Sequence, residues 1–310
     1  ISDLKAATAA FATEADTIRA GGGTRGIERQ HKLGRLTARE RLEKLVDTGS
    51  PIFECGLYAG WNMYSEYGGA PGAGVVTAIA TVGGKLSMII ANDATVKAGA
   101  FFPMTCKKII RAQTIAHRAR LPLLYLVDSA GVFLPLQEDV FPDTDDFGRI
   151  FRNNAVISAD GIPQLAAIMG NCVAGGGYLP VLCDTLLMTE GSGLYLAGPA
   201  LVKAAIGQDV DNEELGGAGM HAEISGTIDF HEPDDESCLE RLRALVHADQ
   251  SVAPVGDPPY QAVGPATDPA SVYDIFQGDP HRQYDTKALL DCILDDESFN
   301  EYKADYGASI

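Results

Sequence analysis

The run Ala-Gly-Gly-Gly at 174–177 is the part of the sequence whose residue types most clearly suggest chemistry. It follows an apolar stretch, 163–169, that predicts a buried strand, and it opens a helix. Amides at the start of a helix lack internal partners and carry partial positive charge, and glycine leaves them unshielded. We therefore interpret Ala174, Gly175 and Gly176 as candidate catalytic residues whose amides would stabilise a negative oxygen, such as that of a thioester enolate. The alternative is a tightly packed corner in which glycine only permits close approach.

A second candidate site follows another apolar stretch. Residues 121–127 (LPLLYLV) are apolar throughout, which is typical of a strand buried on both faces. Ser129, Ala130 and Gly131 come directly after it, and α/β sheets commonly place ligands at the carboxyl ends of their strands. The sequence thus predicts a substrate-binding loop at 129–131.

Patterns typical of metal or nucleophile sites do not stand out. His221 and His231 are far apart without a ligand pattern, and the cysteines are scattered in apolar contexts. No convincing Ser/His/Asp or Cys/His arrangement accompanies them. We therefore expect no metal, and thiols kept reduced in a cytoplasmic or organellar-matrix compartment.

The composition excludes some partners. The net charge of −18 disfavours binding to nucleic acid or to an anionic membrane, and no apolar run is long enough to cross one. A local cluster of Lys107, Lys108 and Arg111 could still hold an anionic ligand; a solvated helix face is the alternative.

The predicted elements favour a layered α/β fold with partly parallel strands. Strands are predicted at 75–82, 85–91, 121–127, 163–169, 185–189 and 194–197. Helices are predicted at 1–20, 27–48, 103–120, 147–159, 180–183, 200–205, 235–247 and 286–293. Thr37 and Glu40 have the spacing of a capping box, and we expect the arginines around them to form ion pairs with the acidic body.

Taken together, the motifs resemble the β (carboxyltransferase) subunits of biotin-dependent acyl-CoA carboxylases, especially the methylcrotonyl-CoA carboxylase branch. The motifs are QHKLGRLTARERLEKLVD at 30–47, ANDATVKAGAFFPMTCKKIIRAQ at 91–113, YLVDSAGVFLPLQEDVFPDTDDFGRIF at 125–151, GIPQLAAIMGNCVAGGGYLP at 161–180 and LAGPALVKAAIGQDVDNEELGGAGMH at 196–221. The resemblance implies a crotonase-like (ClpP/crotonase) fold, a superhelix of ββα units.

The resemblance also implies roles for particular residues. The family's oxyanion motif corresponds to Ala174, Gly175 and Gly176, with the choice of the two inward-pointing amides left open. Ser129, Ala130 and Gly131 match the loop beside the acyl pocket. The residues expected to contact CoA or the acyl group are Ala98, Gly99, Ala100, Phe101, Gly177 and Gly198.

The implied cofactor is biotin, delivered as carboxybiotin, with acyl-CoA as the substrate. No methionine adjoins a lysine, so a biotin attachment motif is absent and the carrier is expected on another chain. The implied partners are a biotin carboxylase/biotin carrier (α) subunit and further β subunits, in a hexamer. The implied location is the cytoplasm, or the mitochondrial matrix in a eukaryote.

The resemblance predicts three segments. Residues 1–250 would form the N-terminal carboxyltransferase domain, 251–283 a linker with six prolines, and 284–310 the beginning of a C-terminal domain that is otherwise absent. Residue 136 is leucine where some relatives carry a basic residue, which leaves the substrate open. Two other functions stay open: the α subunit of a glutaconyl-CoA-type decarboxylase, and a non-catalytic CoA-binding or assembly module.

Overall fold

The computed structural model describes residues 2–141, 145–248, 263–275, 278, 281–296, 298–299 and 301–307. Contacts between residues divide the chain into two units. The first comprises residues 1–251 with 305–310, and the second comprises residues 252–304.

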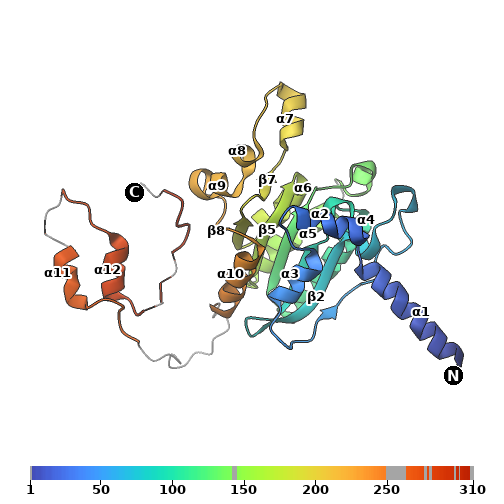
Figure 1. Ribbon diagram of the computed structural model, residues 1–310, viewed down its shortest axis with the longest axis horizontal. Coiled ribbons are helices and arrows are strands. Elements are labelled where there is room, and N and C mark those ends of the chain that lie inside the picture. The colour runs from blue at the N-terminus through green and yellow to red at the C-terminus, as the bar shows by residue number, and fades with distance from the viewer. Residues whose placement is uncertain are drawn as a thin grey trace. The chain divides into compact units, whose positions relative to one another are not determined.

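A mixed sheet forms the centre of the first unit (Figure 1). Within the described residues the strand order is β1-β2-β3-β4-β5-β6-β8. Strand β7 pairs with the carboxyl end of β5. The strands are β1 (Phe53–Glu54), β2 (Val75–Val82), β3 (Lys85–Asn92), β4 (Leu123–Ser129), β5 (Gln164–Val173), β6 (Thr185–Thr189), β7 (Gly193–Tyr195) and β8 (Phe230–Glu232). Strands β1 to β3 are antiparallel neighbours, and every pairing from β3 onward is parallel. The prediction of an α/β fold with partly parallel strands is confirmed.

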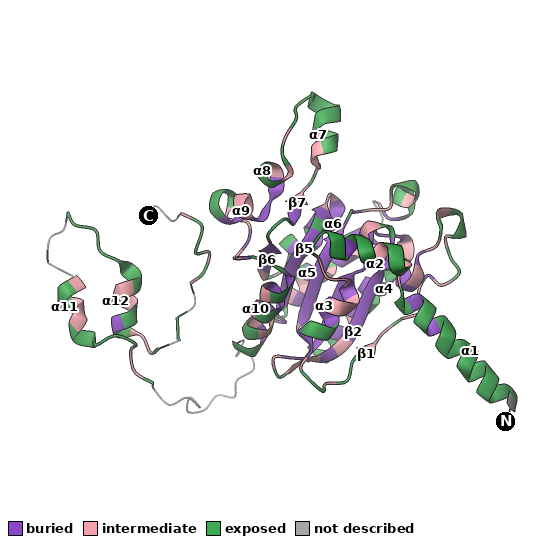
Figure 2. Cartoon of the chain, in the orientation of Figure 1, coloured by how far each residue is buried: buried purple, intermediate pink, exposed green. Residues whose placement is uncertain are grey.

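Helices cover both faces of this sheet. Those of the first unit are α1 (Ser2–Arg19), α2 (Gly23–Lys32), α3 (Ala38–Leu45), α4 (Pro103–Ala119), α5 (Phe147–Ala159), α6 (Gly175–Val181), α7 (Pro199–Ile206), α8 (Asn212–Gly216), α9 (Ala218–Met220) and α10 (Asp235–Ala248). Figure 2 shows the contrast in burial between the purple sheet and α7, which has no buried residue.

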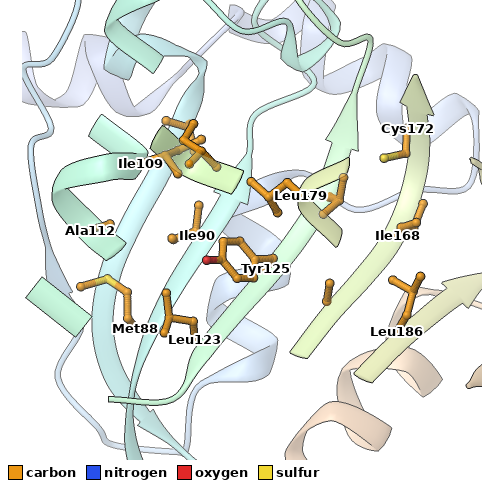
Figure 3. Close-up of a cluster of buried hydrophobic side chains, with 14 of the residues drawn as sticks. Met88, Ile90, Ile109, Ala112, Leu123, Tyr125, Ile168, Cys172, Leu179 and Leu186 are labelled. Carbon is orange, nitrogen blue, oxygen red and sulfur yellow. The ribbon is translucent and has the colours of Figure 1, made fainter. Parts of the chain in front are cut away.

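The strands bury alternate residues in two different cores, as a period of two requires. On β4, Leu123, Tyr125 and Val127 join one core, while Leu124 and Leu126 join the other. Helices α4 and α5 pack on the first core, and α3 and α10 on the second. Figure 3 shows Tyr125 in the first core, with Ile109 and Ala112 of α4 nearby. The alternation fixes the register of β4 and therefore where its carboxyl end lies.

Most predicted elements appear, with shifted bounds. The predicted strands at 75–82 and 185–189 coincide with β2 and β6. The glycine run opens a helix as predicted, at Gly175, and the separate short helix expected at 180–183 is the end of this same helix, which ends at Val181. Propensity disfavours glycine and proline in a helix, but here burial of the segment overrides propensity.

The segment predicted as a single helix at 27–48 is two helices. Helix α2 ends at Lys32, and Thr37 then begins α3 with the predicted capping box. The Glu40 amide donates to Thr37 Oγ1 at 3.3 Å, and the Thr37 amide donates to Glu40 Oε2 at 2.8 Å. The predicted ion pairs are also present, including that between Arg39 and Glu54.

In the second unit, α11 (Val272–Ile275) contacts α12 (Thr286–Ile293), the predicted C-terminal helix. The predicted linker, 251–283, lies largely within this unit, and its residues 251–262 fall outside the described residues. The division of the chain at 250 and 283 stays a prediction.

Candidate active site

The corner between β5 and α6 holds the three candidate catalytic residues. Ala174 has φ 53° and ψ −127°, a conformation that is strained for a residue with a Cβ. Its amide donates to Tyr195 O at 3.0 Å, and the Gly177 amide donates to Ala174 O at 3.0 Å. Within the described part of the chain, the intervening amides of Gly175 and Gly176 have no hydrogen-bond acceptor. The corner therefore presents two adjacent unpaired donors at a helix start.

Packing explains only one of these two glycines. A Cβ on Gly175 would lie 2.6 Å from the ring carbon Cζ of Phe141. A Cβ on Gly176 would lie 3.4 Å from Gly131 Cα and 3.5 Å from Ser129 Oγ, which are ordinary van der Waals distances. Close approach thus accounts for Gly175 but leaves Gly176 without a steric reason to be glycine.

The loop after β4 lies against this corner. The Gly131 amide donates to Ser129 Oγ at 3.1 Å, and the Ser129 hydroxyl donates to Gly99 O at 2.7 Å. Gly131 has φ +86°, and a Cβ there would lie 2.7 Å from Val173 O. The loop is consequently fixed both to β5 and to the segment around Gly99.

That segment, η3 (Lys97–Gly99), adopts three consecutive left-handed conformations. The Ala130 amide donates to Ala98 O at 2.9 Å, and the Phe101 amide donates to Gly131 O at 2.8 Å. A Cβ on Gly99 would overlap the backbone oxygen of Asp128. Main-chain contacts therefore join three segments that are distant in the sequence: 97–101, 128–133 and 173–177.

The structure brings most of the predicted site residues together. The contacts above join Ala98, Gly99, Phe101, Ser129, Ala130, Gly131, Ala174, Gly175 and Gly176, and Ala100 is a buried residue of the same segment. The side chain of Phe101 packs on Phe147 with ring centroids 4.8 Å apart, so it belongs to the core. Gly198 lies apart, at the start of α7 beside the ring of Tyr195.

An apolar cavity of about 550 Å³ lies beside Gly177. Its walls come from β7 and from helices α6 to α8, with His221 and Thr227 at the edge. Apart from Gly177, the lining residues are Tyr178, Val181, Leu194, Tyr195, Leu196, Ala197, Val202, Leu215, His221 and Thr227. No site role is predicted for these side chains from the sequence, because the pairing of β7 with β5 that brings them together depends on distant segments.

Cys172 contacts the corner as well. Its thiol donates to Gly176 O at 3.5 Å, and complete burial raises the pKa of this thiol well above its ordinary value. Since the thiolate is the nucleophilic form, Cys172 is a packing residue here.

The histidines form separate contacts. His221 Nε2 lies 2.8 Å from Leu194 O, and His231 Nε2 lies 2.7 Å from Glu190 Oε2. In the described part of the chain, no three His, Cys, Asp or Glu side chains converge as metal ligands would. No helix among those residues is both long and apolar enough to cross a membrane.

Both interpretations of Lys107, Lys108 and Arg111, as an anion site and as a solvated helix face, are wrong for Lys108. Its Nζ is buried and donates to Val75 O at 2.7 Å and to Gly72 O at 3.0 Å. Lys107 and Arg111 line a separate polar cleft. Lys108 is a structural residue because one face of α4 is turned toward the sheet.

Burial lowers the pKa of Lys108 to about 8 from 10.5. Between these values the unfolded chain binds more protons than the folded one, so this group makes the unfolding free energy rise with pH. Between pH 8 and pH 10.5, we expect the unfolding free energy of the wild type to rise by about 3 kcal/mol more than that of Lys108→Met, at 1.36 kcal/mol per pKa unit. Urea unfolding across this pH range measures the difference. If the unfolding free energies of the two proteins change with pH in parallel, Lys108 does not have the lowered pKa.

The comparisons with known proteins agree with this geometry. The family model described as the carboxyl transferase domain matches residues 29–310. The chain is 44% identical over 291 residues to the biotin-dependent 3-methylcrotonyl-coenzyme A carboxylase beta1 subunit of Mycobacterium tuberculosis, covering 94% of this chain and 55% of that protein. It is 40% identical to the mitochondrial methylcrotonoyl-CoA carboxylase beta chain of Arabidopsis thaliana, covering 94% and 51%.

A solved structure supports the fold. The transcarboxylase 12S structure with methylmalonyl-coenzyme A and methylmalonic acid bound superposes with a TM-score of 0.86 at 30% identity, covering 98% of this chain and 59% of that one. The crotonase-like fold inferred from the motifs is confirmed. The chain spans about half the length of the curated relatives it matches. With a family model matched over most of its length and a fold shared with transcarboxylase, the chain belongs to the carboxyl transferase domain family.

Proposed function

We propose that this chain forms the acyl-CoA half of the carboxyltransferase of a biotin-dependent acyl-CoA carboxylase, acting on a methylcrotonyl-CoA-like substrate. The observation that carries the proposal is the pair of unpaired amides at Gly175 and Gly176, in a corner that packs beside the fixed loop 129–131. The names of the two relatives support both the reaction and the acyl group.

The chain's role in this reaction is to stabilise the negative charge that develops on the thioester oxygen. Removing a proton next to a thioester carbonyl places negative charge on the carbonyl oxygen. The amides of Gly175 and Gly176 would donate to that oxygen, and donors already fixed in place need little reorganisation as the charge develops. Ser129 and Gly131 would hold the thioester against the corner, since both are themselves fixed by hydrogen bonds.

The cavity next to Gly177 fits an apolar part of the proposed substrate. Its lining is almost wholly apolar, which suits the hydrocarbon part of an acyl group. Carboxybiotin, attached to a partner chain, would supply the carboxyl group. The partners proposed on this basis are a biotin carboxylase/carrier subunit and further β subunits, in the cytoplasm or mitochondrial matrix.

The proposal is tested by binding and turnover. Calorimetry compares 3-methylcrotonyl-CoA with a thioether analogue that lacks the carbonyl oxygen. We expect the analogue to bind about tenfold more weakly, because it leaves the two donors unpaired. Carboxylation is then measured with the carrier subunit and the C-terminal half of a relative supplied.

Equal affinity for the two compounds would contradict the role of the amides. Decarboxylation of glutaconyl-CoA, assayed in parallel, without carboxylation of 3-methylcrotonyl-CoA would instead favour the glutaconyl-CoA-type alternative. Binding without either reaction would favour the CoA-binding module. The carboxylase is preferred here because both relatives reported above are carboxylase β subunits.

A further inference from the structure

The pairing of β4 with β5 is interrupted just before the candidate site. Val127 pairs with Ile168, and the next pair is Ser129 with Cys172. Strand β4 thus advances by two residues while β5 advances by four. The extra residues form a bulge at 169–171, and bulges often redirect a strand beside an active site.

An arginine side chain replaces a hydrogen bond that the bulge removes, because Arg41 Nη2 donates to Met169 O at 2.7 Å. A Cβ on Gly170 would overlap the carboxyl group of Asp128. The bulge is therefore shaped around Asp128, with Arg41 as the donor on its other side.

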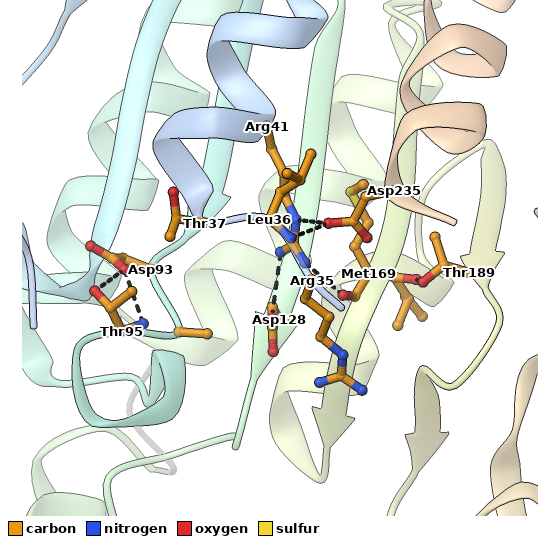
Figure 4. A network of polar contacts seen from close by, with 12 residues as sticks. Arg35, Leu36, Thr37, Arg41, Asp93, Thr95, Asp128, Met169, Thr189 and Asp235 are labelled. Carbon is orange, nitrogen blue, oxygen red and sulfur yellow. Dashed lines mark hydrogen bonds and ion pairs between the residues drawn. The ribbon is translucent and has the colours of Figure 1, made fainter. Parts of the chain in front are cut away.

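Arg41 reaches this position from α3 through the second core. Its side chain is 1% exposed, and its Nε donates to Asp235 Oδ2 at 2.8 Å while Nη1 lies 3.4 Å from Asp128 Oδ2 (Figure 4). Asp235 also accepts from the Leu36 amide at 2.9 Å. A single planar guanidinium thus satisfies acceptors on α10, β4 and β5, a geometry that a lysine ammonium does not reproduce.

The bulge determines how far each strand end extends into the site. Asp128 directly precedes Ser129, and its backbone oxygen contacts Gly99. On β5, three residues separate Asn171 from the unpaired amide of Gly175. A change in the bulge would therefore move the amides relative to loop 129–131.

We propose that Arg41 is a positioning residue, which holds the β5 bulge together with Asp128 and so sets the distance between the Gly175–Gly176 amides and loop 129–131. This inference rests on the proposed function, because it concerns the geometry of the same site.

The test compares two variants that disturb the bulge with one that does not. Arg41→Lys keeps the positive charge but loses the planar guanidinium with its several N–H donors. Gly170→Ala displaces the Asp128 carboxyl group without removing any charge. The control is Arg39→Lys on the same helix, where Arg39 pairs with Glu54 at 2.9 Å away from the bulge. In the assembled enzyme we expect both bulge variants to lose about a hundredfold in kcat, as a displacement of about 1 Å can cause, with KM nearly unchanged.

A second measurement does not depend on turnover. Hydrogen exchange on the free chain should show faster exchange at the amides of the bulge, 169–171, in Arg41→Lys and Gly170→Ala, and no change there in Arg39→Lys. Unfolding curves give the folded fraction to which kcat is normalised.

A loss of kcat only in proportion to the folded fraction, or unchanged exchange at the bulge amides, would overturn the positioning role. An inactive wild type would instead count against the proposed function, since the exchange measurement still reports on the bulge. The two failures are therefore distinguishable.

Discussion

Gly176→Ala is expected to reduce carboxylation by about a hundredfold or more while leaving the protein folded. The added methyl would lie in van der Waals contact with Gly131 and Ser129, beside the unpaired amides, and we expect it to crowd the thioester oxygen that those amides would bind. Its nearest neighbours would be 3.4 and 3.5 Å away, and Gly176 lies in a helix, so the fold itself accommodates alanine. Initial rates and a urea unfolding curve measure the two effects on the same preparation.

The matched control for this prediction is Gly219→Ala. Gly219 lies in the short helix α9, and a Cβ there would meet nothing within 4 Å. It should change neither turnover nor stability appreciably. If Gly176→Ala keeps full turnover, the corner serves packing alone. If it loses folding and turnover equally, the interpretation of Gly176 as free of steric demands is wrong.

Gly99→Ala is expected to have the largest effect on stability of any change considered, beyond about 4 kcal/mol. Two independent penalties coincide at this position. Gly99 has φ +68°, which disfavours any residue with a Cβ, and that Cβ would overlap the backbone oxygen of Asp128. Backbone cannot move aside as a flexible side chain can, so we expect little soluble, folded protein. Thermal unfolding and expression yield measure the outcome.

Gly161→Ala separates the two penalties. Gly161 follows α5 with φ +70°, nearly the same angle, but a Cβ there would meet nothing within 4 Å. It should cost only about 1–2 kcal/mol, the penalty of the left-handed conformation. If Gly99→Ala and Gly161→Ala lose similar amounts of unfolding free energy, the close contact with Asp128 has no role in stability.

The sequence predicted those parts of the site that depend only on residues close together in the chain, such as strand ends, helix starts and caps. The apolar run at 121–127 and the glycines at 174–177 each indicate a strand end or a helix start without reference to the rest of the chain. Thr37 and Glu40 likewise predicted a capping box, because its geometry depends on only four residues. The resemblance to a family then supplied the identity of the loop around Gly99.

Features that depend on contacts between distant segments could not be predicted in this way. The bulge at 169–171 results from a buried arginine more than a hundred residues earlier in the chain. Lys108 and Lys107 are neighbours in sequence, yet one is buried against carbonyl oxygens and the other lines a polar cleft. Which face of α4 turns inward is set by the sheet beneath it. The apolar cavity likewise exists only once β7 has paired with the end of β5.

The donors that the corner offers belong to the main chain, and this has a consequence for how the protein can change by mutation. A point mutation to any residue but proline leaves the N–H groups of Gly175 and Gly176 in place, so these proposed donors are rarely lost by deleting a functional group. Otherwise they can be lost only by blocking them or bending the backbone. The cavity wall is different, because Leu194, Val202 and Leu215 contribute side chains that substitution can reshape. If the proposed function holds, selection in nature or in a mutant library could therefore vary the accepted substrate almost independently of the chemistry.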